Sequence, residues 1–190
     1  MANQFSFERL LLEGAYKIQA FAADDERGRF VKDYATELFA EKGLKHDLKE
    51  VFYTYSHPGV VRAMHFQRIK QQPKLVRCLK GKVYDVIIDL RKNSPTFKKW
   101  LGLYLTEDNL TELYVPAGFG HGYLVYEESI VSYKCAEKFY GEYDDGIRWD
   151  DAEMDIQWPL AEVAANVILS DKDKNLPSFE EFLRRTGGGF

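Results

Sequence analysis

The chain has 190 residues and a formal net charge of −4, with 45% hydrophobic and 29% charged residues. This composition excludes disordered and collagen-like chains, and a chain of this length buries about 70% of its unfolded surface without a disulfide or metal. The acidic balance leaves no general basic surface for nucleic acid or an anionic membrane. We therefore expect a single globular domain over residues 1–190 that binds neither, with any anionic ligand held by local arginine and lysine side chains.

The cysteines and the N-terminus indicate the cellular compartment. Cys78 and Cys135 are too few for a disulfide framework and are expected to be buried, reduced thiols. The first residues lack a basic region followed by an apolar segment, which is the pattern of a secretory signal peptide. No apolar run approaches the roughly 20 residues that span a bilayer. These observations predict a cytoplasmic protein.

Residues 34–42 form the first predicted helix, because Tyr34, Leu38 and Phe39 fall on one face at helical spacing. From residue 50 onward, short apolar or alternating segments are separated by turn residues. The predicted strands are residues 51–56, 60–67, 74–79, 83–90, 97–105, 110–115, 123–126 and 130–135. Strands at this spacing, without intervening helices, predict a mainly β fold, either an antiparallel sandwich or a barrel.

Three other segments are predicted to be irregular or helical. Residues 116–122 are too rich in glycine for a strand and are expected to form a tight turn, and the acidic residues between 144 and 155 indicate a solvated loop. Ser178 and Glu181 form a capping box that opens a short C-terminal helix over residues 177–185. Residues 187–190 are expected to be a frayed tail.

His65 is the first candidate for chemistry, although a single histidine in a strand is more often structural. Simple alternation places Arg62 and His65 on opposite faces of the predicted strand 60–67. Arg62 and Lys74 lie on strands that we expect to be neighbours in one sheet, and three cations at a barrel mouth would suit a diphosphate. The alternative is that these are ordinary exposed edge charges. The chain contains no His/Cys cluster, so no zinc or iron site is expected.

Motifs spread in order over nearly the whole chain identify a family. They are Asp25-x-Arg27-Gly28-x-Phe30, Arg62-x-x-His65-Phe66-Gln67, Lys74-Leu75-Val76-Arg77, Gly81-x-Val83-x-Asp85-Val86, Asp89-Leu90-Arg91, Ser94-Pro95-Thr96, Pro116-x-Gly118-Phe119-x-His121-Gly122, Gly146-Ile147-x-Trp149-x-Asp151, Ile156-x-Trp158-Pro159 and Leu169-Ser170-x-Lys172-Asp173. Together they resemble the dTDP-4-dehydrorhamnose 3,5-epimerase family. The resemblance implies a cupin-type jelly-roll β-barrel, a homodimer, and no metal or organic cofactor.

The family acts on a nucleotide-linked 4-keto-6-deoxyhexose, in deoxysugar biosynthesis for surface polysaccharides such as O-antigen. The C3 and C5 hydrogens of this sugar are both adjacent to the C4 ketone, so removing either gives an enolate that can be reprotonated from the other face. By resemblance, His65 is the base, Asp173 orients it, Tyr133 is the acid on the opposite face, and Lys74 lies near the ketone oxygen. The other residues that the resemblance places in the substrate site are Arg27, Phe30, Lys32, Arg62, Gln67, His121 and Phe139.

Three positions depart from the family pattern. Lys32 replaces a glutamate that contacts thymine, Phe52 replaces an asparagine, and Phe139 replaces a second active-site tyrosine unless Tyr140 fills that place. Because N3 of thymine donates a hydrogen bond and N3 of cytosine accepts one, the ammonium of Lys32 favours a CDP-linked substrate, with dTDP as the alternative. The missing hydroxyl at Phe139 predicts that inversion at C3 dominates over inversion at C5.

We therefore expect an isomerase that inverts C3, and C5 as an open possibility, of a nucleotide-linked 4-keto-6-deoxyhexose. One alternative is a dTDP-4-dehydrorhamnose 3,5-epimerase proper, which inverts both centres. The others are a sugar-nucleotide 3,4-ketoisomerase and a non-catalytic cupin that only binds sugar nucleotides. Deuterium incorporation with the ketone retained at C4 argues against the ketoisomerase, and absence of any solvent exchange would favour the binding protein.

Overall fold

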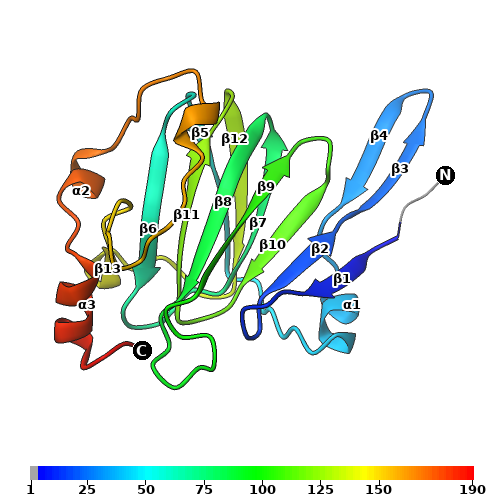
Figure 1. Cartoon of the computed structure of the whole chain (residues 1–190). Coiled ribbons are helices and arrows are strands. Elements are labelled where there is room, and N and C mark those ends of the chain that lie inside the picture. The colour runs from blue at the N-terminus through cyan, green and yellow to red at the C-terminus, as the bar shows by residue number, and fades with distance from the viewer. Residues whose placement is uncertain (1–3) are drawn as a thin grey trace.

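The computed structural model describes residues 4–190, which form two antiparallel sheets packed face to face and a third, two-stranded sheet that projects from them (Figure 1). The larger sheet consists, in spatial order, of β1 (Ser6–Arg9), β2 (Tyr16–Gln19), β10 (Thr111–Val115), β7 (Lys74–Lys80), β12 (Ser129–Cys135) and β5 (Glu50–Ser56). The second sheet consists of β13 (Asp144–Gly146), β6 (Val61–Gln67), β11 (Phe119–Val125), β8 (Lys82–Asp89) and β9 (Trp100–Thr106). The predicted mainly β, cupin-like architecture is confirmed.

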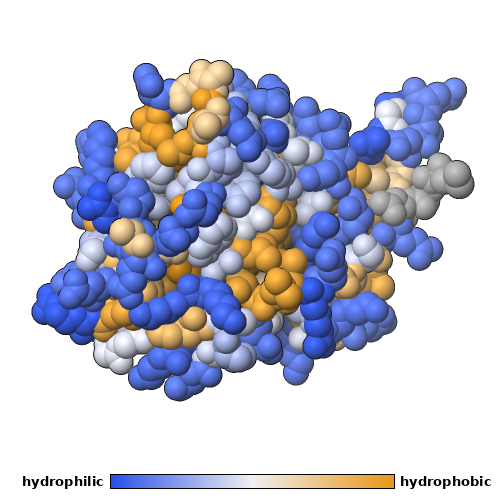
Figure 2. Space-filling view, viewed as in Figure 1, coloured by the Kyte–Doolittle hydropathy of each residue, from blue (hydrophilic) through white to orange (hydrophobic). Residues whose placement is uncertain are grey.

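The β-barrel that the resemblance implied is not closed: the strand pairings within residues 4–190 leave the two sheets facing each other as an open sandwich. A cleft near β9 and β10 is lined partly by Leu10, Leu101 and Leu103, and hydrophobic surface is visible in this region in Figure 2. The main core lies between the sheets and follows the period of two expected for strands. On β12, for example, Val131, Tyr133 and Cys135 point inward.

The predicted strands from residue 50 onward are present, with shifted ends. Strand β9 begins at Trp100 rather than at residue 97, because the preceding residues form turns in which the Phe97 N–H donates to the Ser94 carbonyl. The turn predicted over residues 116–122 is present only at residues 117–118; from residue 119 onward the prediction is wrong, because Phe119–Val125 is the central strand β11. A Cβ on Gly122 would lie 2.3 Å from the Cβ of Ala63 on β6, so close contact between strands requires glycine there.

Helices and loops cover the outer faces of both sheets. The helix α1 (Thr36–Glu41) covers the larger sheet, with Phe39 fully buried, and is shorter than predicted. The C-terminal region covers the other sheet (Figure 1). Its elements are η1 (Gly141–Tyr143), η2 (Leu160–Glu162), α2 (Asp171–Lys174) and α3 (Phe179–Thr186). None of the helices in residues 4–190 is long and apolar enough to cross a membrane.

The C-terminal helix begins as predicted, but the chain after it is not frayed. The Ser178 side chain accepts a hydrogen bond from the Glu181 N–H and so caps α3. Gly187 adopts a left-handed conformation, with φ of 67°, and ends the helix. The Phe190 N–H then donates to the Leu90 carbonyl over 2.9 Å, and its ring lies 5.3 Å from that of Phe66. Aromatic burial therefore holds the tail against the sheet.

The hairpin of β3 (Phe21–Asp25) and β4 (Gly28–Lys32) projects from the two main sheets (Figure 1). Charged residues anchor its base. Asp33, which directly follows β4, accepts hydrogen bonds from Arg77 over 3.2 Å and from Lys134 over 2.9 Å. Lys134 also donates to the fully buried Glu112 over 3.0 Å. The orientation of the hairpin at its base is therefore tied to the outer face of the larger sheet.

Candidate functional site

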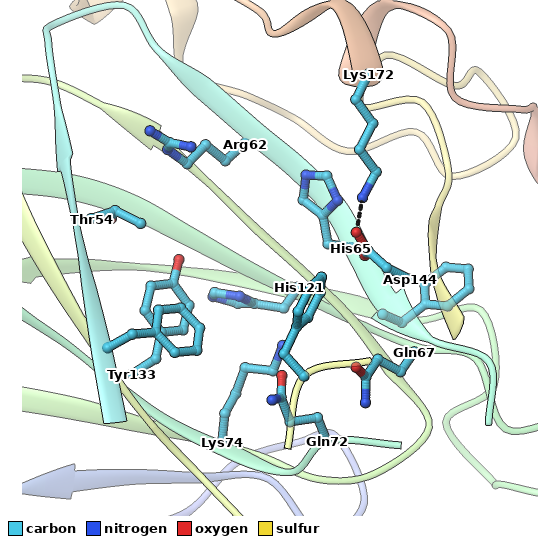
Figure 3. Close-up of a pocket in the computed structure, with 13 residues that line it drawn as sticks. Thr54, Arg62, His65, Gln67, Gln72, Lys74, His121, Tyr133, Asp144 and Lys172 are labelled. Carbon is cyan, nitrogen blue, oxygen red and sulfur yellow. Dashed lines mark hydrogen bonds and ion pairs between the residues drawn. The ribbon is translucent and has the colours of Figure 1, made fainter. Parts of the chain in front are cut away.

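A cavity of about 280 Å³ opens between the two sheets on the side of β5 and β6 (Figure 3). Strands from both sheets and the helix α2 contribute to it. The residues that line it are Phe52, Thr54, Arg62, His65, Phe66, Gln67, Gln72, Lys74, His121, Tyr133, Phe139, Asp144 and Lys172. Seven of these, namely Arg62, His65, Gln67, Lys74, His121, Tyr133 and Phe139, are site residues expected from the sequence.

His65 contacts a buried carboxylate that the sequence supplies from a distant segment. Its Nε2 lies 2.8 Å from Asp173 Oδ1, and the two side chains are 28% and 5% exposed. Ser170 caps α2 by accepting a hydrogen bond from the Asp173 N–H, and its hydroxyl donates to Asp173 Oδ2 over 2.8 Å. Burial raises the pKa of Asp173, but His65, Ser170 and Lys172 outweigh it and hold this pKa below its usual range. The carboxylate is therefore ionised beside the imidazole at neutral pH.

Two expectations about the cations need correction. Arg62 and His65 both line the cavity instead of lying on opposite faces. The pairing of β11 with β6 shifts register between His121–His65 and Tyr123–Arg62, and this bulge gives β6 one extra residue that interrupts simple alternation. Arg62 and Lys74 also belong to facing sheets, not to neighbouring strands of one sheet. The cations converge because the sheets pack face to face.

His121, which lines the cavity, belongs to a second histidine–carboxylate pair. Nε2 of His121 lies 3.0 Å from each carboxylate oxygen of Asp85, and both side chains are almost completely buried. Burial raises the pKa of Asp85 despite the opposing effects of His121 and Lys74. Desolvation lowers the pKa of the Lys74 ammonium, although Cys135, Asp85 and Asp144 oppose this. Lys74 is thus a poorly hydrated cation that would gain from a nearby anion.

Tyr133 faces the same cavity from β12 and is 7% exposed. Burial raises the pKa of its hydroxyl well above the usual range, so the group keeps its proton at neutral pH. His65 and Tyr133 lie on opposite sides of the cavity, with His121 and Lys74 between them (Figure 3).

The structure places Phe139 against the cavity and Tyr140 outside its lining. The Phe139 N–H donates to Glu50 Oε2 over 2.9 Å, and the Tyr140 N–H donates to Gln67 Oε1 over 2.5 Å. The amide nitrogen of Gln67 donates to the carbonyls of Lys70 and Lys138. Gln67 therefore holds this loop in place, and its amide is already occupied by the backbone.

The three site residues expected on the projecting hairpin lie away from the cavity of their own chain. Arg27 pairs with Asp25 and its side chain is 84% exposed, Phe30 is 59% exposed, and Lys32 lies over the ring of Phe21. These contacts are local. The fold of a single chain therefore does not bring these three residues to the cavity that holds His65 and Tyr133.

Sequence reasoning did not assign a site role to several lining residues. They are Phe52, Thr54, Phe66, Gln72, Asp144 and Lys172. Alternation along the predicted strand 51–56 could have identified Phe52 and Thr54, and Lys172 is adjacent to Asp173. Asp144 was expected in a solvated loop, but it forms an ion pair with Lys172 on the His65 side of the cavity (Figure 3). Among residues 4–190, no group of three or more His, Cys, Asp or Glu side chains is arranged to hold a metal.

The arrangement suits removal of a proton next to a carbonyl group. One side of the cavity carries an imidazole with an ionised partner, and the other side carries a protonated phenol. Lys74 lies where it could stabilise an oxyanion, and Arg62 and Lys172 add positive charge for an anionic ligand.

Comparisons with known proteins agree with this chemistry. Residues 9–181 match the dTDP-4-dehydrorhamnose 3,5-epimerase family. The chain is 42% identical to the dTDP-4-dehydrorhamnose 3,5-epimerase of Methanothermobacter thermautotrophicus, over 94% of this chain and 96% of that protein. Among solved structures, dTDP-6-deoxy-D-glucose-3,5-epimerase of Legionella pneumophila in complex with dTDP-4-keto-L-rhamnose superposes with a TM-score of 0.91. It is 28% identical, over 98% of this chain and 99% of that one.

A 3'-monoepimerase of Streptomyces bikiniensis in complex with dTDP-quinovose is also similar. Its TM-score is 0.86 at 28% identity, over 95% of this chain and 90% of that one. The solved structures therefore include enzymes that are described as inverting one centre and others that are described as inverting two. The family match and the relatives cover nearly the whole chain. The chain belongs to the dTDP-4-dehydrorhamnose 3,5-epimerase family and is a sugar-nucleotide epimerase, that is, an isomerase.

Proposed function

We propose that the protein epimerises a dTDP-linked 4-keto-6-deoxyhexose at C3 and C5. The observation that carries this proposal is the position of His65 and Tyr133 on opposite sides of one cavity, with Lys74 between them. The relative and the solved structures named above support dTDP as the nucleotide. They favour dTDP over CDP, the nucleotide that the ammonium of Lys32 suggested.

In the proposed reaction, His65 takes the proton from C3 and the electron pair of the C–H bond forms a C3–C4 enolate. The negative charge that develops on the C4 oxygen is stabilised by Lys74. Tyr133 then donates its hydroxyl proton to the opposite face of C3, which inverts the centre. The resulting imidazolium and phenolate exchange protons with water before the same steps occur at C5. Asp173 keeps the imidazole oriented and stabilises its protonated form.

The diphosphate is proposed to lie beside Arg62 and Lys172. The Arg62 side chain donates to the Ser56 hydroxyl over 3.1 Å and to the Tyr55 carbonyl over 3.5 Å, which leaves guanidinium N–H groups for an anion. Lys172 is paired with Asp144 and could exchange this carboxylate for a phosphate oxygen. His121 and Phe139 border the remaining space of the cavity.

We propose further that two copies assemble as a homodimer in which the β3–β4 hairpin of one copy completes the cavity of the other. Arg27 and Phe30 are exposed on the projecting hairpin. β5 lies at the edge of the larger sheet beside the cavity, and its Val51, Tyr53 and Tyr55 are 55%, 58% and 69% exposed. An exposed apolar edge strand is stable in solution when another chain covers it.

Mixing two inactive variants tests the assembly. His65→Asn disables a cavity, and Arg27→Ala disables a hairpin. If the hairpin acts on the partner's cavity, mixed dimers contain one intact site, and random mixing should recover about a quarter of the wild-type sites. No recovery after the variants are unfolded and refolded together, although each refolds normally alone, would overturn the proposal that the hairpin completes the partner's cavity.

Inversion at C3 alone is the second candidate, and Phe139 favours it. Phe139 has no hydroxyl where the family has a second active-site tyrosine. The Glu50 and Gln67 side chains accept hydrogen bonds from the backbone N–H groups of Phe139 and Tyr140, and these contacts keep Tyr140 from replacing Phe139 in the cavity. The similarity to a 3'-monoepimerase fits this candidate as well.

Incubation with 4-keto-6-deoxyglucose linked to dTDP or CDP in heavy water tests the proposal. Proton NMR should show loss of the C3 and C5 signals with the ketone retained at C4, and faster turnover of the dTDP substrate. Loss of the C3 signal alone would support the second candidate. Absence of exchange at both positions, for both nucleotides, would overturn the assignment as an epimerase of these substrates.

A further inference from the structure

The ring of Tyr133 is enclosed between two aromatic side chains. Phe52 stacks on it with ring centroids 4.7 Å apart and an angle of 15° between the ring planes. His121 meets it edge-on, with centroids 5.8 Å apart and an angle of 78°. Tyr133 is 7% exposed and Phe52 is 37% exposed, so Phe52 separates the phenol from solvent at the mouth of the cavity.

The two neighbours of Tyr133 are held differently. His121 lies on the central strand β11, and both oxygens of the buried Asp85 contact its ring nitrogen. Phe52 lies directly opposite Tyr133 in the pairing of β5 with β12, at the edge of the sheet. Direct cross-strand pairs of aromatic rings restrain each other. Phe52 therefore restrains the phenol on the side that faces solvent.

We infer that Phe52 is a positioning residue that holds the Tyr133 phenol in line for proton delivery to the face of the sugar opposite His65. This inference rests on the acid role proposed above for Tyr133. Proton transfer requires the donor within hydrogen-bond reach of the receiving carbon, and a misplacement of about 1 Å can slow such a step about 100-fold. The ring also shields the hydroxyl from water, which agrees with its raised pKa.

This role has a kinetic signature, because base and acid act on different faces of the sugar. If His65 removes a C3 proton, exchanges it with heavy water and returns a deuteron, the recovered substrate is deuterated without inversion. Inversion needs Tyr133 as well. A misplaced phenol should therefore lower the number of inversions per exchange event, whereas a general loss of structure or substrate binding should lower both rates together.

The experiment compares inversion with same-face exchange at C3 in heavy water, using the dTDP-linked substrate. Phe52→Leu should slow inversion at least 10-fold and change same-face exchange less than threefold. Phe52→Met, a second variant without the ring, should behave in the same way, and Phe52→Tyr should restore inversion to within threefold of wild type. Tyr104→Leu is the matched control, because Tyr104 is equally exposed at 37%, lies on the edge strand β9 of the other sheet, and does not line the cavity.

A parallel fall in inversion and exchange in both ring-free variants, with normal thermal unfolding, would overturn the inference, as would unchanged inversion. Wild-type protein that catalyses no exchange would instead overturn the proposed function, so the two failures are distinguishable. If Tyr104→Leu changed the ratio of inversion to same-face exchange as much as Phe52→Leu does, this would also contradict a specific role of Phe52 in positioning the phenol.

Discussion

Asparagine in place of Asp173 keeps the size of the side chain next to His65 and removes its charge. In the wild-type protein His65 Nε2 lies 2.8 Å from Asp173 Oδ1. Proton abstraction converts the imidazole to an imidazolium, so the carboxylate stabilises the state that follows proton transfer more than the state before it. The variant should therefore lower the rate of C3 exchange and leave nucleotide affinity nearly unchanged.

The size of this effect follows from the distance and the exposure. Two unit charges 2.8 Å apart attract by about 1.5 kcal/mol in bulk water and by about 6 kcal/mol at an effective dielectric constant of about 20. Asp173 is 5% exposed, but His65 is 28% exposed, and water screens part of the attraction. We therefore expect Asp173→Asn to raise the activation free energy of exchange by about 2–4 kcal/mol, which makes exchange roughly 30- to 1,000-fold slower.

The assay is the rate of deuterium incorporation at C3 at saturating substrate, combined with calorimetric affinity for dTDP. Asp171→Asn is the matched control, because Asp171 lies on the same helix with its side chain 94% exposed and pairs with Lys174. Ser170→Ala should give an intermediate loss, since it removes a hydrogen bond to Asp173 and the cap of α2. Exchange by Asp173→Asn within threefold of wild type would show that the pair does not assist the base.

Variants at Glu112, Phe139 and Lys32 test the roles of these three residues. Burial raises the pKa of Glu112 to about 7, so the folded protein holds a proton that the unfolded chain releases above about pH 4.5, and the free energy of unfolding should fall as pH rises through this range. Between pH 5 and pH 8, the free energy of unfolding measured in urea should fall more in wild type than in Glu112→Gln, by on the order of 2 kcal/mol. An equal pH dependence of the two proteins would mean that Glu112 is ionised throughout this range. Phe139→Tyr should raise the ratio of C5 to C3 exchange measured by NMR, and an unchanged ratio would remove Phe139 from control of regiochemistry. If Lys32 meets the base of a ligand in the partner's cavity, calorimetry of Lys32→Glu should show a shift in preference from CDP toward dTDP, and identical preferences would exclude that contact.

Local patterns in the sequence determined most of the strands. Alternation with a period of two predicted β5, β6, β7, β8, β10 and β12 to within one residue at each end, because side chains of a strand point to opposite faces. The same logic failed at β11, where Gly120 and Gly122 suggested a turn. These glycines are explained by Ala63 and Ile88 on neighbouring strands, and such contacts depend on residues far away in the chain.

By itself, the sequence determined a mainly β chain of this epimerase family and most of the side chains that line its cavity. Only the tertiary structure showed that the β6 bulge turns Arg62 and His65 to the same side and that Phe139, not Tyr140, borders the cavity. It also revealed the ion pair of Asp144 with Lys172 and the stacking of Phe52 on Tyr133. The physical reason is that strand formation depends on neighbours in the chain, whereas the faces and partners of a site depend on packing between sheets.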